Sequence, residues 1–323
     1  MSMPRIQPME LDIWIQPAVG TQYVDVAQCA SLINRKGLRQ GYSYFIQDVT
    51  LFAGNSAIAG TGTNELIIER LPNHWPSVNA WTKSLAIWQR SEDQVLDLQP
   101  SIAAKWRDFK IFMDADHANQ SYQLLGNACP IGFGDWDITD PTVATLGYDW
   151  TASEIVIPND PASTSPEGDE AYFLHMVGGN SGTKSKGMIL GYANSRSRPM
   201  SPDPNKPANT GWMVEAFDDG DNLAQIEGNI RAHNDEPPYY LNENAASGTE
   251  YYPGGSSNMG GLAVVAEMTA TQFQTRKSSG PFAANCGLLK FTNAGESTGS
   301  LIRIRLAPGP YKGLLAVPMQ ELN

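Results

Sequence analysis

The stretch Asn64–His117, NELIIERLPNHWPSVNAWTKSLAIWQRSEDQVLDLQPSIAAKWRDFKIFMDADH, places an apolar strand, a long amphipathic helix and a second apolar strand in direct succession. No glycine-rich break interrupts it, and four of the eight tryptophans of the chain lie in it. We expect strands over Asn64–Leu71 and Lys105–Met113. Ser77 follows a proline and offers a side-chain oxygen to cap a helix, so the helix is predicted from Ser77 to about Gln94.

One face of this predicted helix is strongly apolar. Trp81, Leu85 and Trp88 recur at helical spacing, with Val95 as a further candidate. Dense tryptophans suggest a ligand-stacking surface, but a shared helical face is what a helix docked on a sheet requires. We therefore interpret the stretch as a packing element, and only its last five residues, MDADH, remain a candidate site.

Elsewhere the sequence indicates short β-strands between loops rich in Gly, Pro, Ser and Asn. A short helix is predicted over Val24–Lys36, with Asp25 near its start and Gly37 to end it. In the strand predicted at Gly41–Ala53, the pair Gln47-Asp48 suggests a bulge or a change of register. Further strands are predicted at Glu154–Ile157, Ala171–Val177, Gly187–Ala193, Gly211–Ala216, Leu223–Ala232, Gly261–Thr269, Gly287–Thr292, Ser300–Ala307 and Gly313–Pro318.

The spacing of these strands, roughly ten to twenty residues with turn signals between them, favours a sandwich or barrel over a βαβ fold. The chain is predicted to be mainly β, with one or two short helices in its N-terminal half. A break near Tyr148–Thr151 would leave two halves, each the size of one eight-stranded jelly roll. We expect two jelly rolls in tandem: 1–150, with an N-terminal arm and the helix near 77–94, and 151–323, with long loops. A single jelly roll is the alternative.

Charge and cysteine usage exclude several classes of protein. The formal net charge is −12, from 22 Lys+Arg against 34 Asp+Glu, which disfavours a dedicated nucleic-acid-binding domain and leaves only weak local contacts with a genome. The three cysteines are widely spaced and form no CxxC pair, which argues against a disulfide scaffold and a structural zinc site. No signal-peptide pattern opens the chain and no apolar run is long enough to span a bilayer, so we expect synthesis without a secretion signal and no transmembrane segment.

No catalytic motif is visible. The four histidines share no HxH or HExxH spacing, and the sequence shows no GxxxxGK[ST] motif, no GxGxxG motif after a strand and no GxSxG elbow between a predicted strand and a helix. We therefore expect neither an enzyme nor an organic cofactor. A glycosidase-like pair of carboxylates stays open, because acids paired across a sheet leave no local motif.

Two acidic segments are candidates for a structural divalent cation such as calcium. If MDADH continues as a strand, Asp114 and Asp116 point the same way with His117 beside them, and a cation would fit between the carboxylates. In the second segment, FDDGDN, a glycine is surrounded by the carboxylates of Asp218, Asp219 and Asp221. The alternative for both segments is a solvated turn, which acidic residues also suit.

One basic pair stands out near the C-terminus. In Ser300–Ala307, SLIRIRLA, the apolar residues alternate with Arg303 and Arg305. In a strand this alternation puts the arginines on one face and the apolar side chains on the other. We expect one buried and one wet face; alternatively the two arginines meet a phosphate or an acidic neighbour across a subunit contact.

Three pieces of the chain carry a family resemblance. They are YSYFIQDVTLFAG after an early INRKGLRQG turn, the block LPNHWPSVNAWTKSLAIWQ leading into KWRDFKIFMDADH, and the ending GPYKGLLAVPM. In these the chain resembles the jelly-roll capsid proteins of small icosahedral viruses, especially those of small single-stranded DNA viruses and phages. The resemblance implies a self-assembling shell protein of the virion, whose partners are many copies of itself and other virion proteins.

One departure from that family bears on the genome. Capsid proteins of small DNA viruses with one jelly roll usually carry an arginine-rich N-terminal arm, and this chain has none. Either other components bind the genome, or the chain forms two jelly rolls and its shell does not bind nucleic acid directly. A rival hypothesis is a carbohydrate-binding or carbohydrate-active β-sandwich, in which aromatic pairs such as Tyr239-Tyr240 and Tyr251-Tyr252 stack on sugars.

Overall fold

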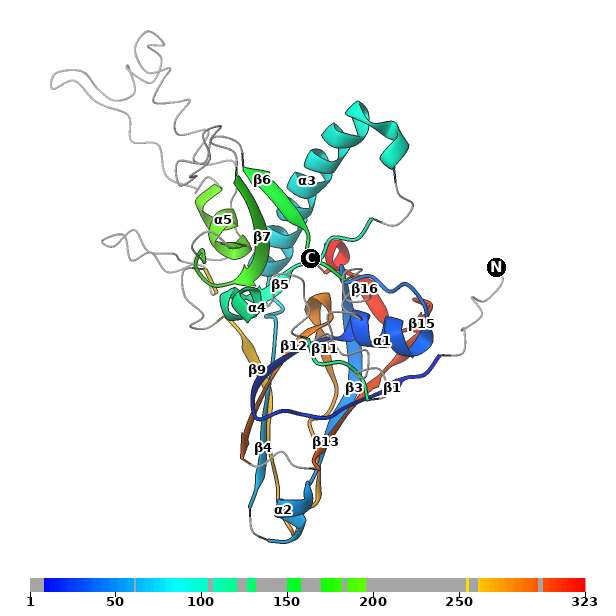
Figure 1. Ribbon diagram of the computed structural model, residues 1–323, viewed down its shortest axis with the longest axis vertical. Coiled ribbons are helices and arrows are strands. Elements are labelled where there is room, and N and C mark those ends of the chain that lie inside the picture. Colours follow the sequence, from blue (N-terminus) through cyan, green and yellow to red (C-terminus); the bar gives the residue numbers. More distant parts are fainter. Residues whose placement is uncertain are drawn as a thin grey trace, which may run out of the picture.

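A computed structural model shows the fold (Figure 1). It describes residues 9–60, 62–103, 107–120, 127–131, 150–157, 170–181, 185–195, 254–255, 261–295 and 299–322. These residues form two antiparallel sheets packed face to face and a smaller lobe that contains a mixed sheet. The chain is therefore mainly β, as predicted.

The first sheet is built on one long central strand. Its members are β1 (Asp12–Ile15), β3 (Tyr42–Phe52), β10 (Arg276–Ser278), β11 (Phe282–Ala284), β13 (Leu301–Leu306) and β16 (Ala316–Pro318). The order is β1-β13-β3-β10, and β11 and β16 also pair with β3. The register between β13 and β3 shifts at Arg305/Leu306, opposite Asp48 and Ile46, so the bulge predicted at Gln47-Asp48 is confirmed.

The second sheet has the order β2-β12-β4-β9, with β2 at Gly20–Asp25, β4 at Asn64–Arg70, β9 at Ala263–Ala270 and β12 at Leu288–Gly295. All of its pairings are antiparallel. The predicted strands at 64–71, 261–269 and 287–292 are confirmed within a few residues. Smaller elements beside the sandwich are α2 (Asn55–Ile58), η3 (Asn285–Gly287), β14 (Pro308–Gly309), β15 (Gly313–Leu314) and η4 (Met319–Glu321).

Strand pairing within both sheets follows one rule. Among the eight strands on the two main paths, β1 pairs with β13, β2 with β12, β3 with β10 and β4 with β9. The arm from 12 to 70 therefore runs antiparallel to the arm from 263 to 306, as in one long hairpin folded into two sheets. Both expected halves, 1–150 and 151–323, supply strands to this one sandwich, so the described residues do not confirm two sandwiches in tandem.

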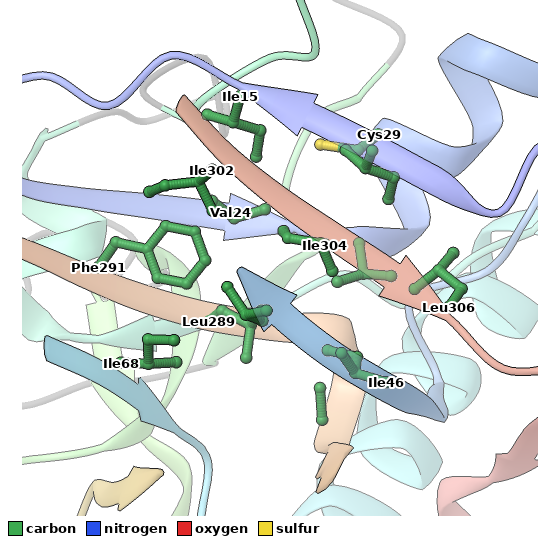
Figure 2. Packing of buried hydrophobic residues seen from close by; sticks show 14 of the residues in the cluster. Ile15, Val24, Cys29, Ile46, Ile68, Leu289, Phe291, Ile302, Ile304 and Leu306 are labelled. Atoms are coloured by element: carbon green, nitrogen blue, oxygen red, sulfur yellow. The ribbon is translucent and has the colours of Figure 1, made fainter. Parts of the chain in front are cut away.

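The core of the sandwich lies between the two sheets. In the first sheet Ile304 stands opposite Ile13 on one neighbouring strand and Val49 on the other, and all three are fully buried. In the second sheet Phe291 stands opposite Ile68. Figure 2 shows residues of both sheets in one buried cluster, with Ile302 and Ile304 from the first sheet and Ile68 and Phe291 from the second. Burial of each such side chain contributes about 1.5–3 kcal/mol to the free energy of folding. This contribution favours packing the apolar faces of the two sheets against each other.

A short helix closes one end of the sandwich. It is α1 (Val26–Asn34), whose N-cap Asp25 accepts hydrogen bonds from the backbone N–H of Ala27 and Gln28. It ends at Arg35, which adopts a left-handed conformation (φ 49°) two residues before the expected Gly37. The helix predicted over Val24–Lys36 is thus confirmed, with its first two residues in β2.

The lobe is inserted between β4 and β9. It contains α3 (Trp75–Leu98), η1 (Pro100–Ile102), β5 (Phe112–Asp114), α4 (Ala115–Gln120), β6 (Glu154–Ile157), β7 (Glu170–Val177), β8 (Ser185–Gly187) and α5 (Met188–Ser195). β5 and β8 pair in parallel with β7, and β6 pairs with it antiparallel. No helix in the described ranges is long and apolar enough to cross a bilayer.

Two predictions in the lobe are wrong. A strand was expected over Lys105–Met113, but the described residues 107–111 are not in a strand. Strand β5 begins only at Phe112 and ends at Asp114. The strand expected over Gly187–Ala193 is mostly the helix α5. Its apolar run is too short for periodicity to distinguish a strand from a helix, and the buried Ile189 and Ala193 fit a helical face.

Helix α3 is longer than the short helix expected. Its N-cap is His74, whose Nδ1 accepts from the backbone N–H of Ser77, and Pro76 lies in the first turn, where no N–H is needed. Trp81 and Trp88 are 4% and 8% exposed and pack against Phe109. The apolar face predicted for this helix is therefore a packing face. Beyond Trp88 the helix projects from the body (Figure 1).

Candidate functional site

The MDADH segment changes structure in its middle. Strand β5 ends at Asp114 and helix α4 begins at Ala115, so Asp114 and Asp116 belong to different elements. Asp114 Oδ1 accepts from the backbone N–H of His117 at 2.8 Å, as an N-terminal helix cap does, and the Asp114 side chain is fully buried. Asp116 is exposed. The expectation that both carboxylates point the same way, with room for a cation between them, is wrong.

Asp114 is instead paired with two residues of the sandwich. The hydroxyl of Tyr23 in β2 donates to Asp114 Oδ1 at 2.7 Å, and Lys290 Nζ in β12 lies 3.1 Å from Asp114 Oδ2. A fully buried position disfavours a charged carboxylate, and the positive charge of Lys290 compensates the negative charge of Asp114. Burial, followed by the charge of Asp114, raises the pKa of Tyr23, so its hydroxyl keeps its proton.

His117 completes this network as a neutral side chain. Its ring stacks on that of Tyr23, its Nδ1 accepts from Met113 N–H at 3.1 Å, and its Nε2 lies 2.8 Å from Asn127 Oδ1. Because Nδ1 accepts, the proton sits on Nε2, which donates to Asn127. Burial lowers the pKa of His117 to about 4. A second proton would remove the Met113 hydrogen bond.

A second buried carboxylate lies at the start of α1. Besides capping the helix, Asp25 accepts through Oδ2 from Gln40 Nε2 at 2.9 Å and from Trp150 Nε1 at 3.0 Å. Gln40 in turn accepts from Ile111 N–H through Oε1 at 2.6 Å. Burial raises the pKa of Asp25 to about 6, against the opposing effect of these hydrogen bonds.

Together these groups form a polar junction between the sandwich and the lobe. We call the set Tyr23, Asp25, Gln40, Asp114, His117, Asn127 and Lys290 the junction network. Its acids and its histidine are fully buried. The network holds β2, β12 and α1 against β5 and α4. Burial shifts the pKa of two of its members into the acidic range, Asp25 to about 6 and His117 to about 4. The sequence indicated Asp25 as a residue near a helix start, but no local signal pairs Tyr23 with Asp114, which is 91 residues away.

The two C-terminal arginines both find acidic partners in their own chain. Arg303 donates to Asp48 Oδ2 at 3.0 Å and to Thr50 Oγ1 at 3.1 Å. Arg305 donates to both carboxylate oxygens of Asp12, at 2.7 and 2.8 Å, and holds the pKa of Asp12 below its usual value. The predicted alternation of β13 is confirmed, but the face expected to be wet carries Arg303, whose side chain is only 10% exposed. Both arginines pair with acids on neighbouring strands of their own chain.

The remaining candidates lie outside the described residues. These are Asp218, Asp219 and Asp221, and the pairs Tyr239-Tyr240 and Tyr251-Tyr252. The strands expected at 211–216 and 223–232 also lie there. Within the described ranges no group of three or more His, Cys, Asp or Glu side chains is placed to hold a metal ion.

One cavity of about 420 Å³ opens where α3 meets the end of the sandwich. Its apolar wall comes from Tyr42, Trp81, Leu85, Trp88, Phe109 and Pro318. Its polar wall comes from Arg39, Gln89, Arg107, Asp108 and Gln320. Burial raises the pKa of Asp108, although Lys110 Nζ, 3.4 Å away, opposes the shift. Aromatic rings beside planar polar groups can hold a small polar ligand.

Comparison with known proteins gave no relatives. No family model, no curated protein and no solved structure matches the chain.

Proposed function

We propose that this chain is the capsid protein of a small icosahedral virus, and that many copies assemble into a shell around the genome. The observation that carries the proposal is the strand order. Counted along the chain, the eight strands on the two main paths pair first with eighth, second with seventh, third with sixth and fourth with fifth. This is the pairing of a jelly roll, an architecture typical of viral capsid proteins.

The proposal is for one jelly roll with a large insertion. Its arms are 12–70 and 263–306, and the lobe occupies the connection between the fourth and fifth strands. Such an insertion at the tip of the folded hairpin leaves the sandwich intact, because no core strand is interrupted. The sequence resemblance to capsid proteins of small single-stranded DNA viruses and phages supports the same function.

The charge supports a shell that does not grip its genome strongly. The net charge of −12 disfavours strong binding to a polyanion, and Arg303 and Arg305 are paired with Asp48 and Asp12. We place the protein in the virion, with other virion proteins and further copies of itself as partners and with only weak local contacts to nucleic acid.

The test is assembly of the purified full-length chain. Size-exclusion chromatography and negative-stain microscopy are expected to show closed particles or discrete capsomers. A chain that remains monomeric over a wide range of concentration and ionic strength would overturn the proposal.

A second candidate function is carbohydrate binding, because jelly rolls also serve as lectins. The observation that favours it is the cavity, where aromatic rings lie beside amide, guanidinium and carboxylate groups. If sugars bind there, removing the exposed polar side chains with Gln89→Ala and Gln320→Ala should abolish retardation on polysaccharide gels. Gln274→Ala, an exposed residue outside the cavity lining, is the matched control.

A further inference from the structure

The C-terminal end of α3 projects from the body (Figure 1) and carries apolar side chains. Ile87, Val95 and Leu98 are 46%, 51% and 84% exposed. We call residues 87–98 the α3 tip. Isolated helices of this length are marginal in water, and most helical stability comes from packing of an apolar face. The α3 tip therefore needs a cover that the described residues do not supply over this face.

One side of the α3 tip is already occupied. Arg107 Nη2, on the segment that returns from the helix, lies 3.1 Å from Asp93 Oδ1, and its guanidinium stands over the Trp88 ring at 5.8 Å. With 3.6 residues per turn, Ile87, Ser91, Gln94 and Leu98 form a different stripe, at spacings of four, three and four. This stripe faces away from Asp93, so the contact between Arg107 and Asp93 does not cover it.

We propose that the cover is the α3 tip of a second copy, packed antiparallel about a two-fold axis. The stripe is self-complementary in that arrangement. Ile87 meets Leu98 of the second copy at each end, and Ser91 meets Gln94 of the second copy in the middle. Apolar residues then pair with apolar residues and polar with polar, which is what an isologous contact requires.

The charges beside the stripe support the same register. Arg90 and Asp97 lie on one flank of it and, among the residues that the structure describes, neither forms an ion pair. In the antiparallel arrangement Arg90 lies within about one helical turn of Asp97 of the second copy, and the symmetry makes this pair twice.

This contact deepens the proposed self-assembly and rests on it for its biological role. About three helical turns bury far less than the roughly 1,600 Å² of a standard stable interface, so the pair is weak on its own. Repetition around a shell raises its effective strength, because each further contact forms between copies already held together.

The test introduces opposite charges at Ile87 and Leu98, the two residues that meet in the proposed contact. Ile87→Lys and Leu98→Glu each place a charge against an apolar partner and should weaken the self-association measured by analytical ultracentrifugation about tenfold or more. The double variant places Lys against Glu of the second copy twice and should recover most of the loss. Far-UV circular dichroism checks that each variant keeps its helices, and Phe273→Lys, at a 91% exposed apolar residue away from α3, is the matched control.

Two results would overturn the inference: single variants that associate like the unaltered chain, or a double variant no better than the singles. Microscopy of the same samples separates this from the proposed function. If the unaltered chain forms particles and the single variants form them equally well, the contact is wrong and the shell function stands. If no chain forms particles, but self-association weakens in the single variants and recovers in the double variant, the shell function is wrong and the contact stands.

Discussion

The ring of Tyr23 lies parallel to the imidazole of His117, with centroids 4.1 Å apart and planes 3° apart. Tyr23 belongs to the sandwich and His117 to the lobe, so this stack crosses the junction between them. His117 is neutral there, and the pKa of Asp25, another member of the junction network, is raised to about 6.

The two groups affect stability in opposite directions. Between about pH 6.5 and 4 the unfolded chain binds a proton at His117 that the folded chain does not, so stability falls as pH falls. Between about pH 3.9 and 6 the folded chain keeps a proton on Asp25 that the unfolded chain releases, so stability falls as pH rises. Each slope is at most about 1.4 kcal/mol per pH unit, and the two largely cancel between pH 4 and 6.

Single variants should reveal separately how Asp25 and His117 make the free energy of unfolding depend on pH. Asp25→Asn keeps a helix cap but cannot titrate, so the free energy of unfolding should rise with pH from about 4 to 6.5. His117→Gln should leave the opposite slope, with stability falling as pH rises from about 4 to 6. Urea denaturation at half-unit pH intervals measures both. Parallel pH profiles for the two variants would contradict this account.

The two arginines of β13 should differ in their importance for stability. The Arg303 side chain is only 10% exposed, and Arg303→Ala leaves Asp48 without its cation, so we expect a loss of about 2 kcal/mol in the free energy of unfolding. The Arg305 side chain is 41% exposed, and water can replace it around Asp12, so Arg305→Ala should cost less. Guanidinium denaturation ranks the two variants, and an equal or reversed order would refute the distinction.

Gly41 tests how tightly α3 packs on the sandwich. A Cβ at this position would lie 2.9 Å from Cζ2 of the buried Trp81 ring, so Gly41→Ala should destabilise the chain by about 1–3 kcal/mol. The matched control is Gly191 in α5, where a Cβ meets nothing within 4 Å and Gly191→Ala should stabilise the helix by up to about 1 kcal/mol. Thermal unfolding followed by tryptophan fluorescence checks both signs. A neutral Gly41→Ala would show that Trp81 can move.

A divalent cation at the segment with Asp218, Asp219 and Asp221 stays a prediction. If loop carboxylates are bridged by calcium between copies, EDTA at moderate ionic strength should loosen the particles, and added calcium should restore them. Light scattering measures particle size, and a triple Asp→Asn variant of these residues should no longer respond to EDTA. Particles of the unaltered chain that are indifferent to chelator would remove the cation from the assembly mechanism.

Several elements were predictable because their signals are local. Alternation in β13 set Ile302 and Ile304 apart from the arginines, and helical spacing brought Trp81, Leu85 and Trp88 onto one face. In contrast, α5 was predicted as a strand because its apolar run has no distinctive period. The MDADH segment could be placed only at the end of a strand, because nothing in its five residues shows that Asp114 caps a helix.

The sequence by itself determined where β3, β4, β9, β12 and β13 lie, since the two-residue period of a strand is a local signal, but it showed no such signal for β10 or β11. It did not determine that β2 pairs with β12, which lies at the other end of the chain, because no local pattern records the partner of a strand. Tertiary structure alone decided that the carboxylates of Asp25 and Asp114 are buried and that the α3 tip is uncovered. Desolvation and exposure depend on what packs nearby, and residues far away in the sequence supply those neighbours.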